Sequence, residues 1–158
     1  MTGGAAVKVA GVGGAEWLAL RTPYQPARNE HADQAAFFAW SAYQEARHPE
    51  LGRLLFAVPN GGRRDKATAG KLKAEGVKAG TPDVLLLAPA CHYAGLALEF
   101  KKQGGRLEPE QRAFLEAAAA AGYLCAVTWA WEAGRDLVAA YLSRNPARLS
   151  ALLESWAP

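Results

Sequence analysis

The chain has 158 residues, a formal net charge of +3, and 51% hydrophobic against 21% charged residues. This length and composition predict a single globular domain with a sizeable core and exclude an intrinsically disordered protein. No apolar run approaches the ~18 residues of a membrane span, and no secretory signal is evident, so we expect a cytoplasmic protein without a membrane contact. Cys91 and Cys125 lack metal-ligand spacing, and we expect two free thiols.

The first 28 residues are rich in Gly, Ala and Pro without sustained periodicity, and we expect a poorly defined N-terminal arm there. The patterned remainder, residues 29–158, is predicted to form one domain. Its first helix begins after Asn29, a suitable N-cap, and carries apolar residues at spacings of three and four. A short strand is expected at 54–58 and a basic surface helix at 63–76, with Gly76 as its stop.

Two short strands are expected at 83–87 and 96–101, then a helix from Pro109 to residue 121 and a strand at 123–129. Two further helices follow at 133–143 and 147–156. This order predicts the α/β class, with a mixed central sheet built around the hairpin of the two short strands and flanked by helices. Apolar residues of the last two helices could cover the sheet or form a dimer surface: Leu137, Val138, Tyr141, Leu142, Leu149, Leu152, Leu153 and Trp156.

Two carboxylates lie at the ends of the two hairpin strands. Antiparallel pairing around a turn near Cys91 places Asp83 opposite Glu99. Because side chains alternate along a strand, Glu99 and Lys101 share one face, while Leu96, Leu98 and Phe100 fill the other. Carboxylates that close raise each other's pKa unless a cation lies between them, and a hard divalent ion would supply more charge than Lys101 alone. The plainer alternative is a cross-strand ion pair of Glu99 and Lys101, with Asp83 capping a turn.

Five sequence pieces stand around these residues in chain order: PNGGRR (59–64), LKAEGVKAGTPDV (72–84), LEFK (98–101), GRLEPEQ (105–111) and GY (122–123). In order and spacing they resemble the VRR-NUC branch of the PD-(D/E)xK nuclease superfamily, in the stand-alone form found in phages and bacteria. The resemblance covers about two thirds of the chain and implies a restriction-endonuclease-like fold and a metal-dependent phosphodiesterase.

The resemblance also implies roles for individual residues. Mg²⁺ or Mn²⁺ would be held by Asp83, Glu99, the backbone carbonyl of Phe100 and Glu30. Lys101 would orient or help to deprotonate the attacking water and offset charge on the transition state, and Gln111 would hydrogen-bond a water or phosphate. Two of these residues have plainer readings, Glu30 as a first-turn helix acid and Gln111 as a surface residue. Glu108 departs from the serine usual in the family, which puts the cap of its helix in doubt.

A basic segment precedes the first of the two hairpin strands. Residues 63–78 contain six basic residues against two acids, and the sequence pI of about 9.0 permits a polyanionic partner. Its position beside the acids favours contacts with DNA backbone phosphates, and shape recognition over base reading. A solvated helix face is the alternative. The candidate DNA-binding residues are Asn60, Arg63, Arg64, Lys66, Lys71, Lys73 and Lys78.

The expected function is a structure-selective DNA endonuclease, since the family suggests branched DNA and a homodimer that resolves Holliday junctions. A two-fold dimer would match a four-way junction, with one site for each of two opposed strands. A duplex nicking or restriction-type nuclease and a non-catalytic DNA-binding protein with the same fold are the alternatives. No small-molecule cofactor is expected, and a small-molecule enzyme would need a pocket motif that the sequence lacks.

Overall fold

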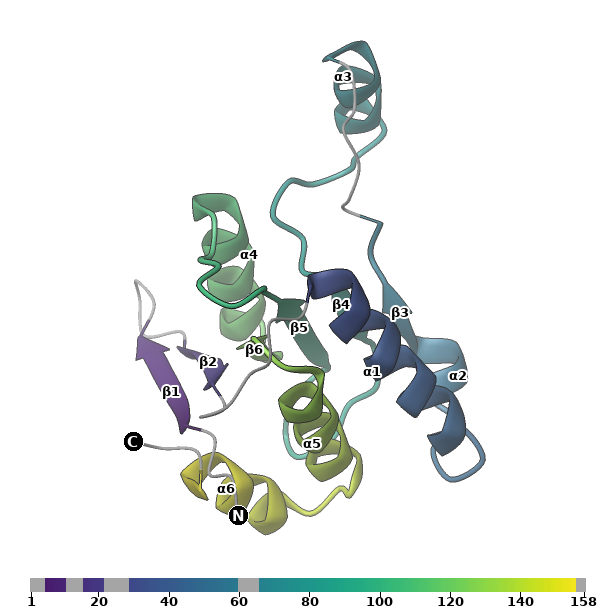
Figure 1. Ribbon diagram of the computed structural model, residues 1–158, viewed down its shortest axis with the longest axis vertical. Helices are drawn as coiled ribbons and strands as arrows, with labels where there is room; N and C mark the ends of the chain where they lie inside the picture. Colours follow the sequence, from purple (N-terminus) through teal and green to yellow (C-terminus); the bar gives the residue numbers. More distant parts are fainter. Residues whose placement is uncertain (1–4, 11–15, 22–28, 60–65, 156–158) are drawn as a thin grey trace.

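The computed structural model describes residues 5–10, 16–21, 29–59 and 66–155, and the structural statements below concern these residues. One mixed sheet has the strand order β1-β2-β6-β5-β4-β3, and helices flank it, which confirms the predicted α/β class (Figure 1). The strands are β1 (Ala5–Ala10), β2 (Glu16–Arg21), β3 (Leu55–Ala57), β4 (Val84–Leu86), β5 (Leu96–Phe100) and β6 (Leu124–Thr128). The helices are α1 (Glu30–Gln44), α2 (Leu51–Leu54), α3 (Lys66–Ala74), α4 (Pro109–Ala120), α5 (Trp131–Leu142) and α6 (Pro146–Ser155).

The centre of the sheet is formed by β5 and β6, which pair in parallel and are buried along their whole length. One face carries α1 and α5, and its core includes Phe37, Leu98 and Leu137. The other face carries α4, with Leu115 and Val127 in its core. A sheet covered on both faces positions polar residues at its strand ends, where the apolar layers stop.

The hairpin of β4 and β5 has the predicted register, with Val84 opposite Leu98 and Leu86 opposite Leu96. Its connecting loop is fastened to α5 by Tyr141, whose buried hydroxyl donates to the Ala88 carbonyl at 2.7 Å. The same oxygen accepts from the Ala90 N–H at 3.1 Å. The loop of the hairpin is therefore held by one phenol from a helix distant in sequence.

The largest difference from the sequence prediction lies before residue 29. The expected irregular arm contains β1 and β2, and β2 pairs with β6 next to the centre of the sheet. The expectation was wrong because residues 17–20 are buried as a continuous run, so β2 lacks the alternation of a half-exposed strand. The sheet thus extends across the boundary expected at residue 29. The single turn of α2 was also not expected.

The apolar residues of α5 and α6 cover the sheet. Leu137, Val138, Tyr141, Leu142 and Leu149 are buried in the core, which removes them as a dimer surface. Leu152 and Leu153 pack against this core, while Trp156 lies outside the described residues.

Both cysteines are free thiols, as expected, with Cys125 buried and Cys91 half-buried. Among the described residues, no helix has the length and apolar character needed to cross a membrane.

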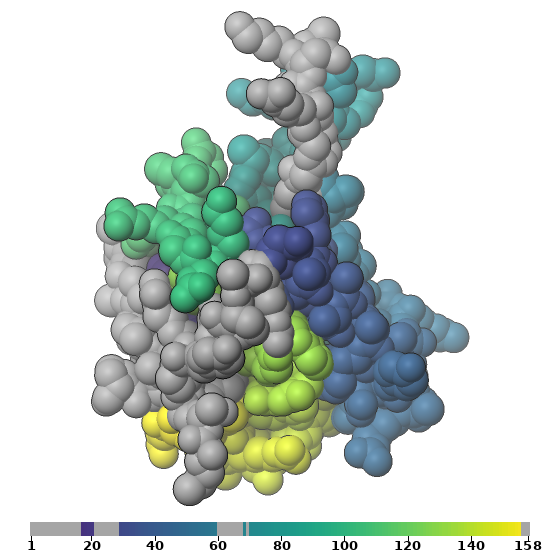
Figure 2. Space-filling model, viewed as in Figure 1, coloured from purple at the N-terminus to yellow at the C-terminus, as the bar shows by residue number. Residues whose placement is uncertain are grey.

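The α3 helix projects from the rest of the molecule (Figures 1 and 2). Its exposed residues include Lys71 and Lys73, and none of its described side chains is buried. The predicted stop is confirmed: Gly76 has φ +93°, and the Val77 N–H bonds back to the Leu72 carbonyl at 2.9 Å. The predicted start at 63 falls outside the described residues, which resume at Lys66.

We predict that Tyr141→Phe lowers the free energy of unfolding by about 1–3 kcal/mol, because it leaves the buried Ala88 carbonyl without its donor. Urea denaturation measures this. Tyr43→Phe is the matched control, since Tyr43 is 86% exposed and should change stability by less than about 0.5 kcal/mol. Equal effects of the two substitutions would show that the hydroxyl does not hold the loop.

Candidate active site

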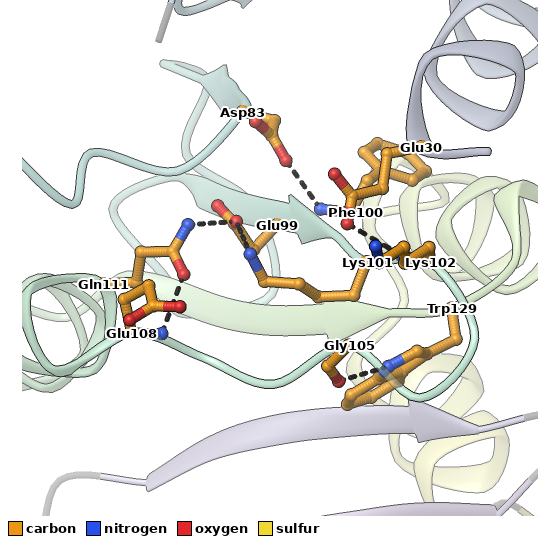
Figure 3. A network of polar contacts seen from close by, with 10 residues as sticks. All are labelled: Glu30, Asp83, Glu99, Phe100, Lys101, Lys102, Gly105, Glu108, Gln111 and Trp129. Carbon is orange, nitrogen blue, oxygen red and sulfur yellow. Dashed lines mark hydrogen bonds and ion pairs between the residues drawn. The ribbon is translucent and has the colours of Figure 1, made fainter. Parts of the chain in front are cut away.

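Four elements meet at one end of the sheet and bring together the polar residues of Figure 3. Asn29 caps α1, accepting from the Ala32 N–H at 2.7 Å, and so fixes Glu30 in the first turn. Asp83 directly precedes β4, and Glu99 lies within β5. Pro109 begins α4 as predicted, with Gln111 two residues further on.

Glu99 is the most buried of these charged groups, with only 2% of its surface exposed. Its Oε1 atom accepts hydrogen bonds from the Lys101 ammonium at 2.8 Å and from the Gln111 amide. Its Oε2 atom is enclosed, and no group among the described residues reaches hydrogen-bonding geometry with it. Half of a buried carboxylate thus lacks the compensation that burial requires.

The raised pKa values of Glu99 and Asp83 also indicate too little positive charge around these carboxyl groups. Burial, and then the charge of Asp83, raise the pKa of Glu99 to about 7, while Lys101 and the Asp83 N–H lower it only in part. Burial also raises the pKa of Asp83, and the Glu30 carboxylate adds to the rise. The Phe100 N–H, which donates to Asp83 Oδ2 at 2.9 Å, opposes it. A further cation at this place would lower both pKa values.

The backbone carbonyl of Phe100 faces the same region. In an antiparallel ladder, the N–H and C=O of one residue point to the same neighbouring strand, and the Phe100 N–H points to Asp83. If the register of β4 and β5 is extended, Pro82 stands opposite Phe100, and proline has no N–H to donate. The Pro82 ring therefore gives this carbonyl no backbone ladder bond, and the carbonyl points to the side of the hairpin that carries Asp83.

The remaining predicted residues support this arrangement. Glu30 Oε1 accepts from the Lys102 N–H at 2.8 Å and so joins α1 to the end of β5. Gln111 accepts from the Glu108 N–H at 3.0 Å while its amide donates to Glu99, which links the start of α4 to the buried acid. The Gln111 contact answers the doubt about the helix start, because the glutamine itself bonds the N-cap backbone.

The donor set fits a hard divalent cation. Glu99 Oε2 is unpartnered within the described structure, and the charge of Asp83 acts on Glu99. The Phe100 carbonyl points to the same side of β5 as its N–H, which bonds Asp83. Oxygen donors of this kind suit Mg²⁺ or Mn²⁺, and the chemistry differs from that of a zinc site. In the described ranges, no group of three or more His, Cys, Asp and Glu side chains lies close enough to hold an ion. The ion would therefore need the backbone carbonyl and water as additional ligands.

The predicted DNA-binding residues lie on or near the projecting α3. Lys71 lies 4.0 Å from Glu75 on the same helix, whereas Lys73 and Lys78 are exposed and form no ion pair with the described residues. Asn60, Arg63 and Arg64 fall outside the described residues, as does the side chain of Lys66.

Two structural contacts were not expected from the sequence. Gly80, with φ +76°, lies so close to the first turn of α4 that an added Cβ would stand 2.3 Å from the Glu110 carbonyl. The indole of Trp129 donates to the Gly105 carbonyl at 3.0 Å and holds the loop between β5 and α4. The glycine before Thr81-Pro82-Asp83 could have indicated a tight approach, but nothing local to Trp129 indicates its partner.

The fold and site together define an α/β protein of nuclease-like fold, with two carboxylates and a lysine at the end of a β-hairpin. A family profile for the VRR-NUC domain matches residues 25–130. A solved structure described as a VRR_NUC domain protein is similar at a TM-score of 0.65 and 25% identity, over 76% of this chain and 93% of that one. No curated protein matches the chain.

The chain belongs to the VRR-NUC family. Its members are nucleases and typically depend on divalent metal ions. Family membership therefore implies a nuclease-type function in DNA processing.

We predict that Glu99→Gln stabilises the protein at pH 8 in EDTA by about 1–3 kcal/mol and has little effect at pH 4.5. The pKa of Glu99 is raised from 4.5 to about 7, so the folded state binds the extra proton between these values. The contribution of Glu99 to the free energy of unfolding of the wild type therefore falls as pH rises through this window, and it stays low above the window. Urea denaturation at both pH values measures the difference. The exposed Glu154→Gln is the control, and equal stabilisation at both pH values would contradict the cause.

We predict that Gly80→Ala lowers stability by about 2–4 kcal/mol, since it adds a left-handed alanine and a collision with the α4 backbone. Gly76→Ala has the same backbone strain, with φ +93°, but meets nothing within 4 Å. Gly76→Ala should therefore lower the free energy of unfolding only through the backbone strain, by about 1–2 kcal/mol. Thermal and urea unfolding compare the two, and equal losses would mean that the loop yields at Gly80 without cost.

Proposed function

We propose that this protein is a Mg²⁺- or Mn²⁺-dependent endonuclease that hydrolyses phosphodiester bonds in branched DNA, and that it resolves four-way junctions as a homodimer in the cytoplasm. The observation that carries the proposal is the buried, unpartnered Oε2 of Glu99 beside Asp83. A protein that only bound DNA would gain nothing from two acids near a phosphate, because like charges repel.

Asp83, Glu99 and the Phe100 carbonyl would hold the ion, with Glu30 near it. When bound, the ion supplies an activated water and a Lewis acid for the phosphate. Lys101 keeps its ammonium at the site through its 2.8 Å contact with Glu99, where the charge offsets that developing on the phosphate. Gln111 contacts Glu99 through its amide, which supports a role in orienting the carboxylate, and it would hydrogen-bond a water or phosphate oxygen.

The choice of branched DNA rests on the family resemblance and on the exposed lysines of the α3 region. Lys73 and Lys78 support contacts with backbone phosphates, which position DNA without reading its sequence. A two-fold dimer would place one site on each of two opposed strands of a junction.

The test incubates the purified protein with a labelled four-way junction, linear duplex, splayed arms and single strands, each with Mg²⁺, Mn²⁺ or EDTA. We predict paired, symmetric cuts on the junction that require a divalent ion. Lys101→Ala should reduce cutting by about 10²-fold or more, because it removes the charge that offsets the transition state. Sedimentation of the protein with and without junction measures the dimer.

Other results of this test would contradict different parts of the proposed function. Cutting of all substrates would keep the nuclease and remove the junction preference. Tight binding without cutting under any ion would overturn the catalytic proposal and leave a DNA-binding protein. A thermal shift with Mg²⁺ or Mn²⁺ that is lost in Glu99→Ala tests the ion site without relying on activity. Symmetric cuts by a monomer would contradict the proposed homodimer and leave the rest of the proposal standing.

A further inference from the structure

A hollow of about 680 Å³ lies between two parts of the chain. One is the end of α3 with the segment that follows it, together called the α3 arm, and the other is the first turn of α4. The size of the hollow falls within the ~300–1,000 Å³ of sites that receive small ligands. One wall comes from residues 72–81 and includes Leu72, Val77 and the exposed Lys73 and Lys78. The other wall is the start of α4, with Glu108, Glu110 and Gln111. Figure 1 shows this part of the chain descending from α3 beside α4 to reach β4.

The hollow shares one residue, Gln111, with the candidate active site. Gln111 lines it and also donates its amide to Glu99, so one side chain borders both places. The two walls meet at Gly80, where an added Cβ would stand 2.3 Å from the Glu110 carbonyl, so no side chain fits between them there. Gln111 and the backbone contact at Gly80 thus keep the hollow in a constant position relative to Glu99.

The charges of the two walls differ in sign. Lys73 and Lys78 lie on the arm side, whereas Glu108 and Glu110 lie on the α4 side. A phosphate in the hollow would be attracted to the first wall and repelled by the second. Between the lysines, Val77 exposes 44% of its surface, an apolar contact for a sugar or base without a protein partner that covers it.

We infer that this hollow receives one unpaired nucleotide adjacent to the phosphodiester that is cut, with its phosphate along Lys73 and Lys78 and its base against Val77 and Leu72. The inference rests on the proposed nuclease function and adds a source of selectivity to it. A paired nucleotide must first leave the duplex, and this costs least where the base is already unpaired. Branched DNA supplies such nucleotides at its branch point, and continuous duplex does not.

The carboxylates do not account for such a preference, because every phosphodiester presents the same charge to them. The preference requires a contact that only an exposed base or sugar can make, and apolar side chains inserted beside a base provide one. Val77 and Leu72 are aliphatic, so the contact should tolerate any base. This agrees with recognition of DNA structure instead of sequence.

The experiment uses the full chain and a four-way junction in EDTA, with 2-aminopurine placed in turn at each position around the branch point. An unstacked 2-aminopurine brightens, so fluorescence reports the nucleotide that enters the hollow. We expect one position to brighten on binding of the wild type and to lose about half or more of that rise with Val77→Ser. Leu87→Ser is the matched control, because Leu87 is 45% exposed and lies outside this hollow, and it should keep the full rise.

A second readout uses cleavage with Mg²⁺ or Mn²⁺. One mismatched nucleotide beside the mapped cut should speed cutting of a duplex by about tenfold or more in the wild type and in Leu87→Ser, and by much less in Val77→Ser. Replacement of Lys73 and Lys78 by Gln should weaken junction binding more than Lys71→Gln, since Lys71 faces Glu75. Circular dichroism checks that each variant is folded.

The outcomes separate this inference from the proposed function. No cutting by the wild type under any ion removes the nuclease, while the fluorescence in EDTA still tests the hollow. Cutting with no brightened position, with equal brightening in Val77→Ser, or with brightening away from the cut overturns the hollow as a nucleotide site and leaves the nuclease intact.

Discussion

The structure depends on a carboxylate placed inside a buried strand. Glu99 lies in β5, which is buried along its whole length, and an ionised acid there is costly unless it is paired and hydrogen-bonded. Lys101 and Gln111 satisfy one of its oxygens and leave the other enclosed without a donor among the described residues. Most of the local architecture brings partners to this group, and the incomplete compensation is the feature that points to a cation. Complete compensation by protein groups would have made the same residues an ordinary buried ion pair.

The elements around the acid converge through contacts distant in sequence. Glu30 ties the first turn of α1 to the end of β5, and Gln111 ties the first turn of α4 to the acid itself. Tyr141 fastens the hairpin loop from the opposite end, while Trp129 fastens the loop that leads to α4. A catalytic geometry needs side chains held by rigid elements. Here the contacts of Gln111, Tyr141 and Trp129 are buried or partly buried, while that of Glu30 lies at the surface.

How far the sequence predicts this structure can be judged from particular residues. The register of β4 and β5 follows from the turn placed near Cys91, and the alternation of Leu96, Leu98 and Phe100 places Glu99 on the opposite face. The strand β2 could not be found in this way, since burial on both faces removes the alternation on which the method rests. The bond from Trp129 to Gly105 and the hollow beside Gln111 arise from tertiary placement, which leaves no local pattern. Prediction thus succeeded where a physical constraint acts between neighbours in one strand or helix.

Under the proposed function, the carboxylate site and the α3 region would carry two tasks that have opposite structural needs. Hydrolysis of a phosphodiester needs charges held rigidly, and the buried ends of β4 and β5 provide this. Selection among DNA structures needs a surface that the duplex can reach, and the exposed α3 projects from the rest of the molecule as such a surface would (Figure 2). Gly80 joins them, because the loop from the arm meets α4 there at backbone contact. Under the proposed function, substitutions in the α3 region would alter which DNA is held without moving Asp83 or Glu99, whereas a side chain at position 80 would disturb both at once.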